Sequence, residues 1–356
     1  MTNMTQDPSV RVTIGVDTHR DVHVAVALDH LGRRLGELAV PTNRAGYADL
    51  LSWAEAQGDI EAFGIEGTGS YGSGLSRWLR DRDFAVIEVS RPNRQARRRR
   101  GKSDPADAEA AARAVLSGEA SGTPKSADDK VEMIRMFRVA RSGAHKARTA
   151  AINALRGLVV TAPVELAEEL KGLSVDDLVG RATRFRPGPL VSTTAGAKAA
   201  MASLARRIKA LDDEIAALTQ ALEPLVAEAC PALVALYGVG TDSAGALLVS
   251  AGDNSGRLSS ERAAAKLWGV APMEASSGMV TRHRLNRGGD RQANAALYRI
   301  VFVRMRHHQA TRDYVERRIK EGKSKREIMR CLKRYVVREV FAALTATEER
   351  SPELVA

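Results

Sequence analysis

Apolar and polar residues alternate in three short runs at the start of the chain. The runs extend from Val10 to Val16, from Val22 to Leu28 and from about Leu35 to Val40. A period of two is typical of half-buried β-strands, and the turn residues at 29–32 favour an antiparallel connection. Residues 10–40 are therefore predicted to form a three-stranded meander.

Helix-like and strand-like patterns alternate after this meander. We predict a helix over 45–56, a short buried strand over 62–65 and a second helix around Leu75. A fifth strand over 84–89 and a helix starting at Asp104 follow. Three antiparallel strands followed by alternating helix and strand are the order of the RNase H-like fold, so this part is predicted to be an α/β domain.

The middle of the chain has helical periodicity. Residues 131–158 predict one long helix, and the proline-containing stretch 160–194 predicts a short helical region with a linker or insertion. From Leu204 to Leu225, leucine and isoleucine recur at steps of four and three, which is a heptad seam. The seam fits a coiled coil between protomers or one arm of an antiparallel hairpin with 131–158, and the two readings are compatible.

The last third is predicted to be mostly helical. Gly238 and Gly240 separate two helical segments, as in the turn of a helix-hairpin-helix element, which offers backbone N–H groups to phosphate. Residues 293–341 are helical and basic, with Tyr298 and Ile300 among the expected core residues.

The fold class is thus α/β plus α, divided into an RNase H-like domain, a helical coiled-coil region and a mostly helical C-terminal domain. The predicted boundaries are 1–122, 123–229 and 230–346, with a frayed tail over 347–356.

Composition narrows the class of partner. The 356-residue chain has a net charge of +11 and only 4% aromatic residues, so we expect a polyanion held through its phosphates more than through base stacking. Cys230 and Cys331 are too few for a disulfide framework or a zinc cluster. No apolar run reaches the roughly 18 residues of a membrane span, and the polar start lacks a signal-peptide core. We expect a cytoplasmic protein without a membrane partner.

Four carboxylates follow predicted strands or begin a predicted helix. Asp17 and Glu66 end strands, while Asp104, predicted as the N-cap before Pro105, and Asp107 lie at the start of a helix. In an RNase H-like sheet such positions converge, and several carboxylates around Mg²⁺ or Mn²⁺ are what two-metal phosphoryl transfer needs. Each acid alone also fits a turn or a solvated helix start.

Basic residues gather in three places. The first run stands beside the helix that starts at Asp104, and the second is a stripe that fits an exposed, solvated helix face equally well. The third follows the serines at 276 and 277. The nucleic-acid-binding candidates are Arg97, Arg98, Arg99, Arg100, Lys102, Arg138, Arg141, Arg148, Arg282, Arg284 and Arg287, together with Gly238 and Gly240.

Ser276 and Ser277 precede Gly278 in the third of these regions. A serine beside a glycine, with arginines behind it, can attack phosphate, because guanidinium groups stabilise the negative charge that develops there. The alternative is a polar loop that caps a helix.

Taken together, these motifs resemble the transposases of insertion-sequence family one-ten, the bridge-RNA-guided recombinases. The matching segments fall in the family's order and span nearly the whole chain. They are Gly15-Val16-Asp17-Thr18, Ile65-Glu66-Gly67-Thr68-Gly69-Ser70-Tyr71, Lys102-Ser103-Asp104-Pro105-Ala106-Asp107-Ala108, Gly238-Val239-Gly240, and Gly269-Val270-Ala271-Pro272 leading to Ser277-Gly278.

The resemblance implies a RuvC-like domain whose metal-binding acids are Asp17, Glu66, Asp104 and Asp107, and a C-terminal transposase domain. The catalytic serine would be Ser277, with Ser276 as the register alternative. The resemblance further implies DNA cleavage and exchange through a phosphoserine, with a guide RNA encoded by the element pairing with element and target DNA. It also implies association with the bacterial nucleoid and a homo-oligomer, a dimer or a dimer of dimers.

Two other functions fit the same residues. The first is a RuvC-like nuclease that cuts branched DNA with metal-activated water and uses its C-terminal domain only for binding. The second is a non-catalytic nucleic-acid-binding relative.

Overall fold

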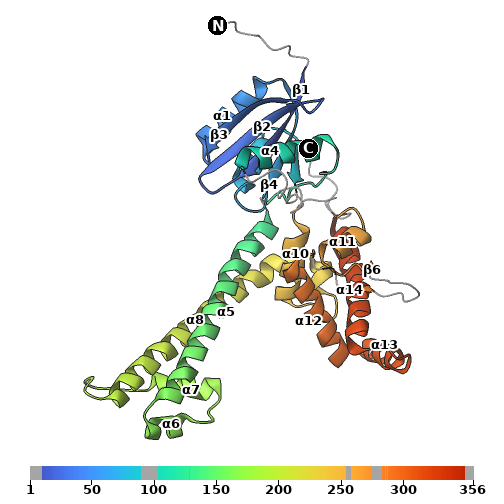
Figure 1. Cartoon of the computed structure of the whole chain (residues 1–356). Helices are drawn as coiled ribbons and strands as arrows, with labels where there is room; N and C mark the ends of the chain where they lie inside the picture. Colours follow the sequence, from blue (N-terminus) through green and yellow to red (C-terminus); the bar gives the residue numbers. More distant parts are fainter. Residues whose placement is uncertain are drawn as a thin grey trace. The chain divides into compact units, whose positions relative to one another are not determined.

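The computed structural model describes residues 10–89, 103–127, 129–253, 258–274, 283–284, 286 and 288–348 (Figure 1). The chain divides into two compact units, which are described separately. The first contains the residues up to Asp129, and the second contains most residues from Lys130 onward. The domain boundaries at 122, 229 and 346 stay predictions.

The first unit is built on a five-stranded mixed sheet in the order β3-β2-β1-β4-β5. The pairs β1–β2 and β2–β3 are antiparallel, whereas β4 is parallel to β1 and β5 is parallel to β4. The elements are β1 (Arg11–Thr18), β2 (Val22–Asp29), β3 (Arg34–Pro41), α1 (Arg44–Glu55), β4 (Asp59–Glu66), α2 (Ser73–Arg80), β5 (Val86–Val89) and α4 (Asp104–Leu116). The predicted meander and the α/β character of this part are confirmed.

Alternation along β1 explains why the sheet is covered on both faces. Val12, Ile14 and Val16 belong to one core with residues of α1 and α2, including Leu50 and Leu75. On β2, Val26 and Leu28 instead form a cluster with Ala108 and Ala112 of α4, so this helix covers the opposite face. Because successive strand residues point to opposite faces, Gly15 and Asp17 share the α4 face of β1.

Two glycines bring the backbone of α4 unusually close to the sheet. Gly15 and Gly64 are register partners on β1 and β4. A Cβ atom on Gly15 would overlap with the carbonyl oxygen of Ala108, and one on Gly64 would lie 3.0 Å from the carbonyl oxygen of Ala111. The absence of both side chains therefore sets the height and direction of α4 above the two strands.

Gly15→Ala is expected to destabilise the first unit by about 2 kcal/mol, within the range that overpacking of a core costs. The added methyl group meets backbone atoms of α4, which no change of rotamer can move aside. Urea unfolding measures the loss. Gly69→Ala is the matched control, because a Cβ atom there has no atom of the described residues within 4 Å. Equal unfolding midpoints for the two variants would contradict the close approach of α4.

The second unit is helical apart from one short strand pair. Its elements are α5 (Lys130–Thr161), α6 (Val164–Leu170), α7 (Val175–Thr183), α8 (Thr193–Ala229), α9 (Pro231–Val234), α10 (Thr241–Ala251), α11 (Glu261–Leu267), β6 (Met273–Glu274), β7 (His283–Arg284), α12 (Arg291–His307), α13 (Gln309–Lys320) and α14 (Lys325–Glu348). Throughout the described ranges, no helix combines the length and the apolar character that a membrane span requires.

The heptad seam lies on α8, and α8 packs along α5 as an antiparallel hairpin (Figure 1). Lys130 pairs with Glu228 near one end, and Arg148 pairs with Asp212 further along, which fixes the opposite directions of the two helices. The intrachain hairpin is thus confirmed, while a coiled coil between protomers stays a prediction. The predicted insertion over 160–194 contains α6 and α7, whose apolar side chains complete a core with α5 and α8.

A second core in this unit surrounds Trp268, whose side chain is fully buried among residues of α10, α11, α12 and α14. Ile300 is buried there as predicted. The prediction that Tyr298 is a core residue is wrong, because this residue is 48% exposed. The buried face of α12 is set by Ala293, Ala296 and Leu297, which leaves Tyr298 on the outward side of the helix.

Candidate metal centre

Three side chains of the first unit converge on one point. The Nε2 atom of His19 lies 3.2 Å from Oδ2 of Asp17 and 3.3 Å from Oδ1 of Asp104. One potential ligand atom from each residue falls within 4.8 Å of the others. The Asp17 side chain is only 10% exposed, whereas those of His19 and Asp104 are about half exposed, so the cluster opens to solvent on one side.

The strand and helix geometry explains this convergence. Asp17 follows Gly15 by two residues on the face of β1 that α4 covers, and the first turn of α4 carries Asp104 and Asp107. On the parallel neighbour β4, Glu66 follows Gly64 by the same two residues. The carboxyl ends of these adjacent strands therefore lie next to the N-terminal turn of the covering helix.

The electrostatics of the cluster favour a bound positive charge. Burial raises the pKa of the Asp17 carboxyl above its usual value; nearby His19 opposes this rise, while Asp107 and Asp104 add to it. Asp107 itself is buried. Carboxylates of like charge that converge in a partly buried place repel one another, and a divalent cation between them removes that repulsion.

The donor set fits a divalent cation. Carboxylate oxygens are hard ligands of the kind that Mg²⁺ and Mn²⁺ prefer, and an imidazole nitrogen is accepted more readily by transition metals. Asp17 and Asp104 can supply the oxygens, and His19 can supply the nitrogen or hold both carboxylates in place.

The structure brings the sequence candidates together to different degrees. Asp17 and Asp104 share the cluster, and Asp107 contributes to the electrostatic field at Asp17. Glu66 ends the adjacent strand, where its backbone carbonyl accepts a 2.7 Å hydrogen bond from Oγ1 of Thr18. The catalytic roles of all four acids stay predictions.

The predicted N-cap was one residue late. Ser103 has the extended backbone of a cap, and the helix begins at Asp104, so Pro105 is its second residue. Serine and aspartate are both favoured at N-caps, which is why the sequence did not separate them. The shift places the Asp104 carboxylate in the first helical turn, where the helix dipole favours negative charge.

Sequence reasoning missed His19. The available signal was an imidazole two residues after Asp17, just beyond the strand end, where alternation returns the side chain to the same face. Recognising it required knowing that α4 starts directly above that point.

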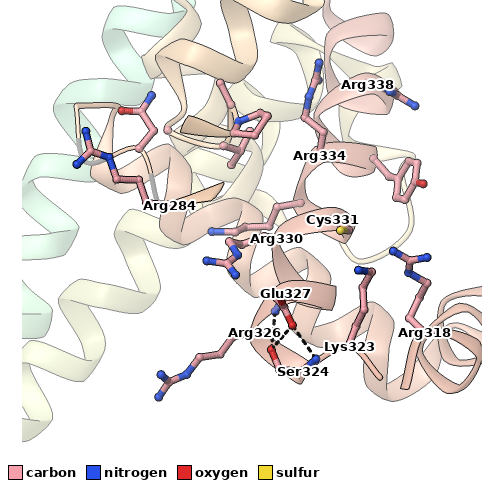
Figure 2. Close-up of a pocket in the computed structure, with 17 residues that line it drawn as sticks. Arg284, Arg318, Lys323, Ser324, Arg326, Glu327, Arg330, Cys331, Arg334 and Arg338 are labelled. Atoms are coloured by element: carbon pink, nitrogen blue, oxygen red, sulfur yellow. Dashed lines mark hydrogen bonds between the residues drawn. The ribbon is translucent and has the colours of Figure 1, made fainter. Parts of the chain in front are cut away.

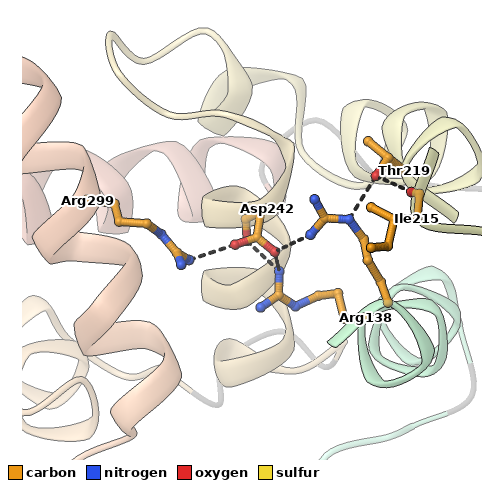
Figure 3. A network of polar contacts seen from close by, with 6 residues as sticks. Arg138, Ile215, Thr219, Asp242 and Arg299 are labelled. Atoms are coloured by element: carbon orange, nitrogen blue, oxygen red, sulfur yellow. Dashed lines mark hydrogen bonds and ion pairs between the residues drawn. The ribbon is translucent and has the colours of Figure 1, made fainter. Parts of the chain in front are cut away.

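The basic stripe of α5 has partners within the chain. Figure 3 shows the carboxylate of Asp242, in the first turn of α10, between Arg138 and Arg299. The Nη1 atom of Arg138 lies 2.7 Å from Oδ1 of Asp242, that of Arg141 lies 3.3 Å from the same oxygen, and Nη2 of Arg299 lies 2.7 Å from Oδ2.

Arg148, the third residue of that stripe, pairs with Asp212 of α8. These arginines therefore join α5 to α8 and α10. Neither of the two interpretations of the stripe, a solvated helix face or a nucleic-acid contact, predicted these contacts within the chain. Contact of Arg138, Arg141 and Arg148 with nucleic acid stays a prediction.

The remaining candidates are placed only in part. Gly238 has a φ of +77° in the turn between α9 and α10, Gly240 directly precedes α10, and Arg284 is exposed on β7. Nine further candidates lie outside the described residues. They are Arg97, Arg98, Arg99, Arg100, Lys102, Ser276, Ser277, Arg282 and Arg287.

Two segments of the chain match models of known protein families. Residues 14–162 match the model of the DEDD transposase domain of IS110, described as "Transposase". Residues 230–316 match the model described as "Transposase IS116/IS110/IS902 family". The first match contains all four acids, and the second contains both serines.

A curated relative gives the same result over a shorter stretch. The "Insertion element IS110 uncharacterized 43.6 kDa protein" of Streptomyces coelicolor is 33% identical over 148 residues. That match covers 40% of this chain and 35% of the relative, so it spans about a third of the relative's length. With two family models that together cover about two thirds of the sequence, the chain belongs to the IS110 family of transposases.

Proposed function

We propose that this protein is a DNA transposase that cuts and rejoins DNA strands by phosphoryl transfer. The observation that carries the proposal is the convergence of Asp17, His19 and Asp104 where α4 begins above the sheet. The strand order β3-β2-β1-β4-β5, with α4 on one face, further supports an RNase H-like fold for the first unit.

Asp17 and Asp104 would hold Mg²⁺ or Mn²⁺, with Asp107 and Glu66 as further acids. A metal bound there would stabilise negative charge on the phosphate and on the reacting oxygens. His19 bridges the two carboxylates from its place just after β1 and thereby fixes their orientation. The half-exposed side of the cluster leaves room for a phosphodiester to approach Asp104.

The strand would be cut by a serine. The Oγ atom of Ser277, or of Ser276 in the alternative register, attacks phosphorus and forms a Ser–O–P bond. The bond from phosphorus to one strand end breaks, and that end leaves as a hydroxyl after taking up a proton. In the rejoining step, a hydroxyl of the exchanged strand attacks the phosphoserine and releases the serine. Arg282, Arg284 and Arg287 would stabilise the charge on the phosphate.

Choice of the DNA sites would rest with a guide RNA encoded by the element. The high positive charge and low aromatic content support binding through phosphates, which leaves sequence recognition to base pairing. A dimer or a dimer of dimers would bring two DNAs together for exchange.

The test is a reaction of purified protein with its element ends, a target DNA and the RNA transcribed beside its gene, with and without Mg²⁺. We expect joined DNA and a protein–DNA adduct that survives denaturing electrophoresis, both only with metal. Cut DNA without an adduct would instead identify a nuclease that uses water. Absence of any DNA product would favour a non-catalytic binding protein.

A further inference from the structure

A basic pocket of about 870 Å³ opens in the second unit (Figure 2). Its walls come from α13, from α14, from the turn after α11 and from β7. Among the described residues that line it, eight are lysine or arginine, and Glu327 alone is acidic. The volume is within the range of sites that bind small ligands, so a nucleotide-sized group can enter.

Lys333 is the buried cation of this pocket. It is 6% exposed, and its ammonium group donates a 2.9 Å hydrogen bond to Oδ1 of Asn294. The amide of Asn294 is held in that orientation, because its Nδ2 donates to the carbonyl oxygens of Trp268 and Gly269. Within the described part of the chain, no carboxylate forms an ion pair with Lys333.

A buried ammonium with only a neutral partner is costly for the fold. Burial lowers the pKa of Lys333, and the neighbouring positive charge of Arg330 lowers it further. Buried charges are normally paired with an opposite charge, because their loss of hydration is otherwise uncompensated. An anionic group bound beside Lys333 would compensate for this loss.

Two carboxylates of this region, one in the lining and one bound to lining arginines, already have partners. Glu261 accepts a 2.8 Å hydrogen bond from Nη2 of Arg334 and lies 4.0 Å from Nε of Arg338. Glu327 accepts hydrogen bonds from the backbone nitrogen and the hydroxyl of Ser324, at 2.9 and 2.7 Å, and so caps the start of α14. Neither carboxylate neutralises Lys333.

Two further lining cations leave the pocket with an excess of positive charge. Arg330 is exposed on α14 and Arg284 is exposed on β7. In the residues that the structure covers, neither has a carboxylate within ion-pair distance. Tyr335 adds an exposed ring to the lining, with the guanidinium of Arg338 5.5 Å from its centre.

We propose that this pocket binds a phosphodiester group of a nucleic-acid strand, with Lys333 as its buried contact and Arg330 and Arg284 as its outer contacts. Phosphate oxygens accept several charge-assisted hydrogen bonds at once, which matches a site that offers donors and excess positive charge. A continuous strand rather than a free phosphate matches the open, nucleotide-sized space and the ring of Tyr335, on which a base can stack.

The pocket's place in the fold connects it with the reaction. Pro272 directly precedes β6 and Arg284 belongs to β7, and these two strands pair with each other on either side of the segment that contains Ser276 and Ser277. A phosphate in the pocket would belong to a strand held at the base of that strand pair. This inference rests on the proposed function for the identity of its ligand.

Binding of single-stranded DNA and of RNA of the same sequence to the full chain, measured by fluorescence anisotropy across a salt series, tests the pocket. Lys333→Gln and Arg330→Gln are each expected to weaken binding roughly tenfold, as loss of a hydrogen bond to a charged group does. The slope of log affinity against log salt should fall by about one. Lys171→Gln, an equal loss of charge at an exposed position, should change neither quantity.

A loss for DNA alone, for RNA alone or for both supports the pocket and identifies the strand that occupies it. Wild-type affinity and salt slope in Lys333→Gln and Arg330→Gln for both nucleic acids would overturn it. Thermal unfolding separates binding from packing: Lys333→Gln should unfold at the same or a higher temperature, because it removes a buried unpaired charge, whereas a structural lysine would give a lower midpoint.

Two further results separate the pocket from folding and from the transposase function. If Lys333→Gln does not fold, the exposed Arg330→Gln decides the question. If the wild type transfers strands and both variants bind nucleic acid as the wild type does, the proposed role of the pocket is wrong and the transposase function still holds. If the variants bind nucleic acid more weakly but the wild type transfers no strands, the proposed function is wrong and the role of the pocket still holds.

Discussion

Asp17→Asn is expected to lower metal-dependent strand transfer by roughly a thousandfold, the loss typical of removing a group that stabilises charge in a transition state. The substitution keeps the size of the side chain and removes a carboxylate from the cluster with His19 and Asp104. Product formation at saturating Mg²⁺ and DNA measures the loss. The matched control is Asp49→Asn, an exposed position on α1, which should keep wild-type activity.

The same variant is expected to be more stable than the wild type without metal. The raised pKa of Asp17 means that the folded state disfavours its charged form, so the carboxylate lowers stability at neutral pH. This cost disappears as the pH falls through the raised pKa, and asparagine removes it at every pH.

Added Mg²⁺ should reverse the order of stability. A metal present at a hundred times its dissociation constant stabilises the wild type by about 2.7 kcal/mol and a variant that cannot bind it by much less. Thermal unfolding with and without Mg²⁺ measures both effects. An Asp17→Asn protein that is stabilised by Mg²⁺ as strongly as the wild type would contradict the metal centre.

Ser277→Ala is expected to abolish the protein–DNA adduct and to lower strand transfer by more than about ten thousandfold, as loss of a catalytic nucleophile does. Removing one hydroxyl leaves no oxygen to form the Ser–O–P bond. Denaturing electrophoresis with labelled DNA detects the adduct directly, and DNA binding should be retained.

Ser276→Ala is the control, because it makes the same change one residue earlier. Adduct formation by Ser276→Ala but not by Ser277→Ala supports Ser277, and the opposite result moves the role to Ser276. If both single variants and the double variant still formed the adduct, neither serine would be the nucleophile.

Local periodicity explains why so much of the fold was predictable. The alternation in β1, β2 and β3 identifies strands, because neighbours two residues apart share a face. The heptad seam of α8 likewise identified a packed helix, since its spacing depends only on helical geometry. The four acids could be proposed because strand ends and helix starts are visible in the sequence, although the exact N-cap was not.

Contacts between distant segments were not predictable. Arg138, Arg141 and Arg148 form a basic stripe in the sequence, but Asp242 and Asp212, which pair with them, lie far along the chain. The environment of Lys333 was unpredictable for the same reason, because Asn294 and the turn after Trp268 lie in other segments of the chain.

The sequence by itself determined the α/β start, the helical remainder and the family, because periodicity and short motifs are properties of neighbouring residues. Only the tertiary structure decided that α4 rests on Gly15 and Gly64, that His19 joins Asp17 and Asp104, and that Lys333 is buried beside a neutral amide. These features depend on contacts between elements that are distant in the sequence. Such contacts are determined by the packing of the whole chain and not by neighbouring residues.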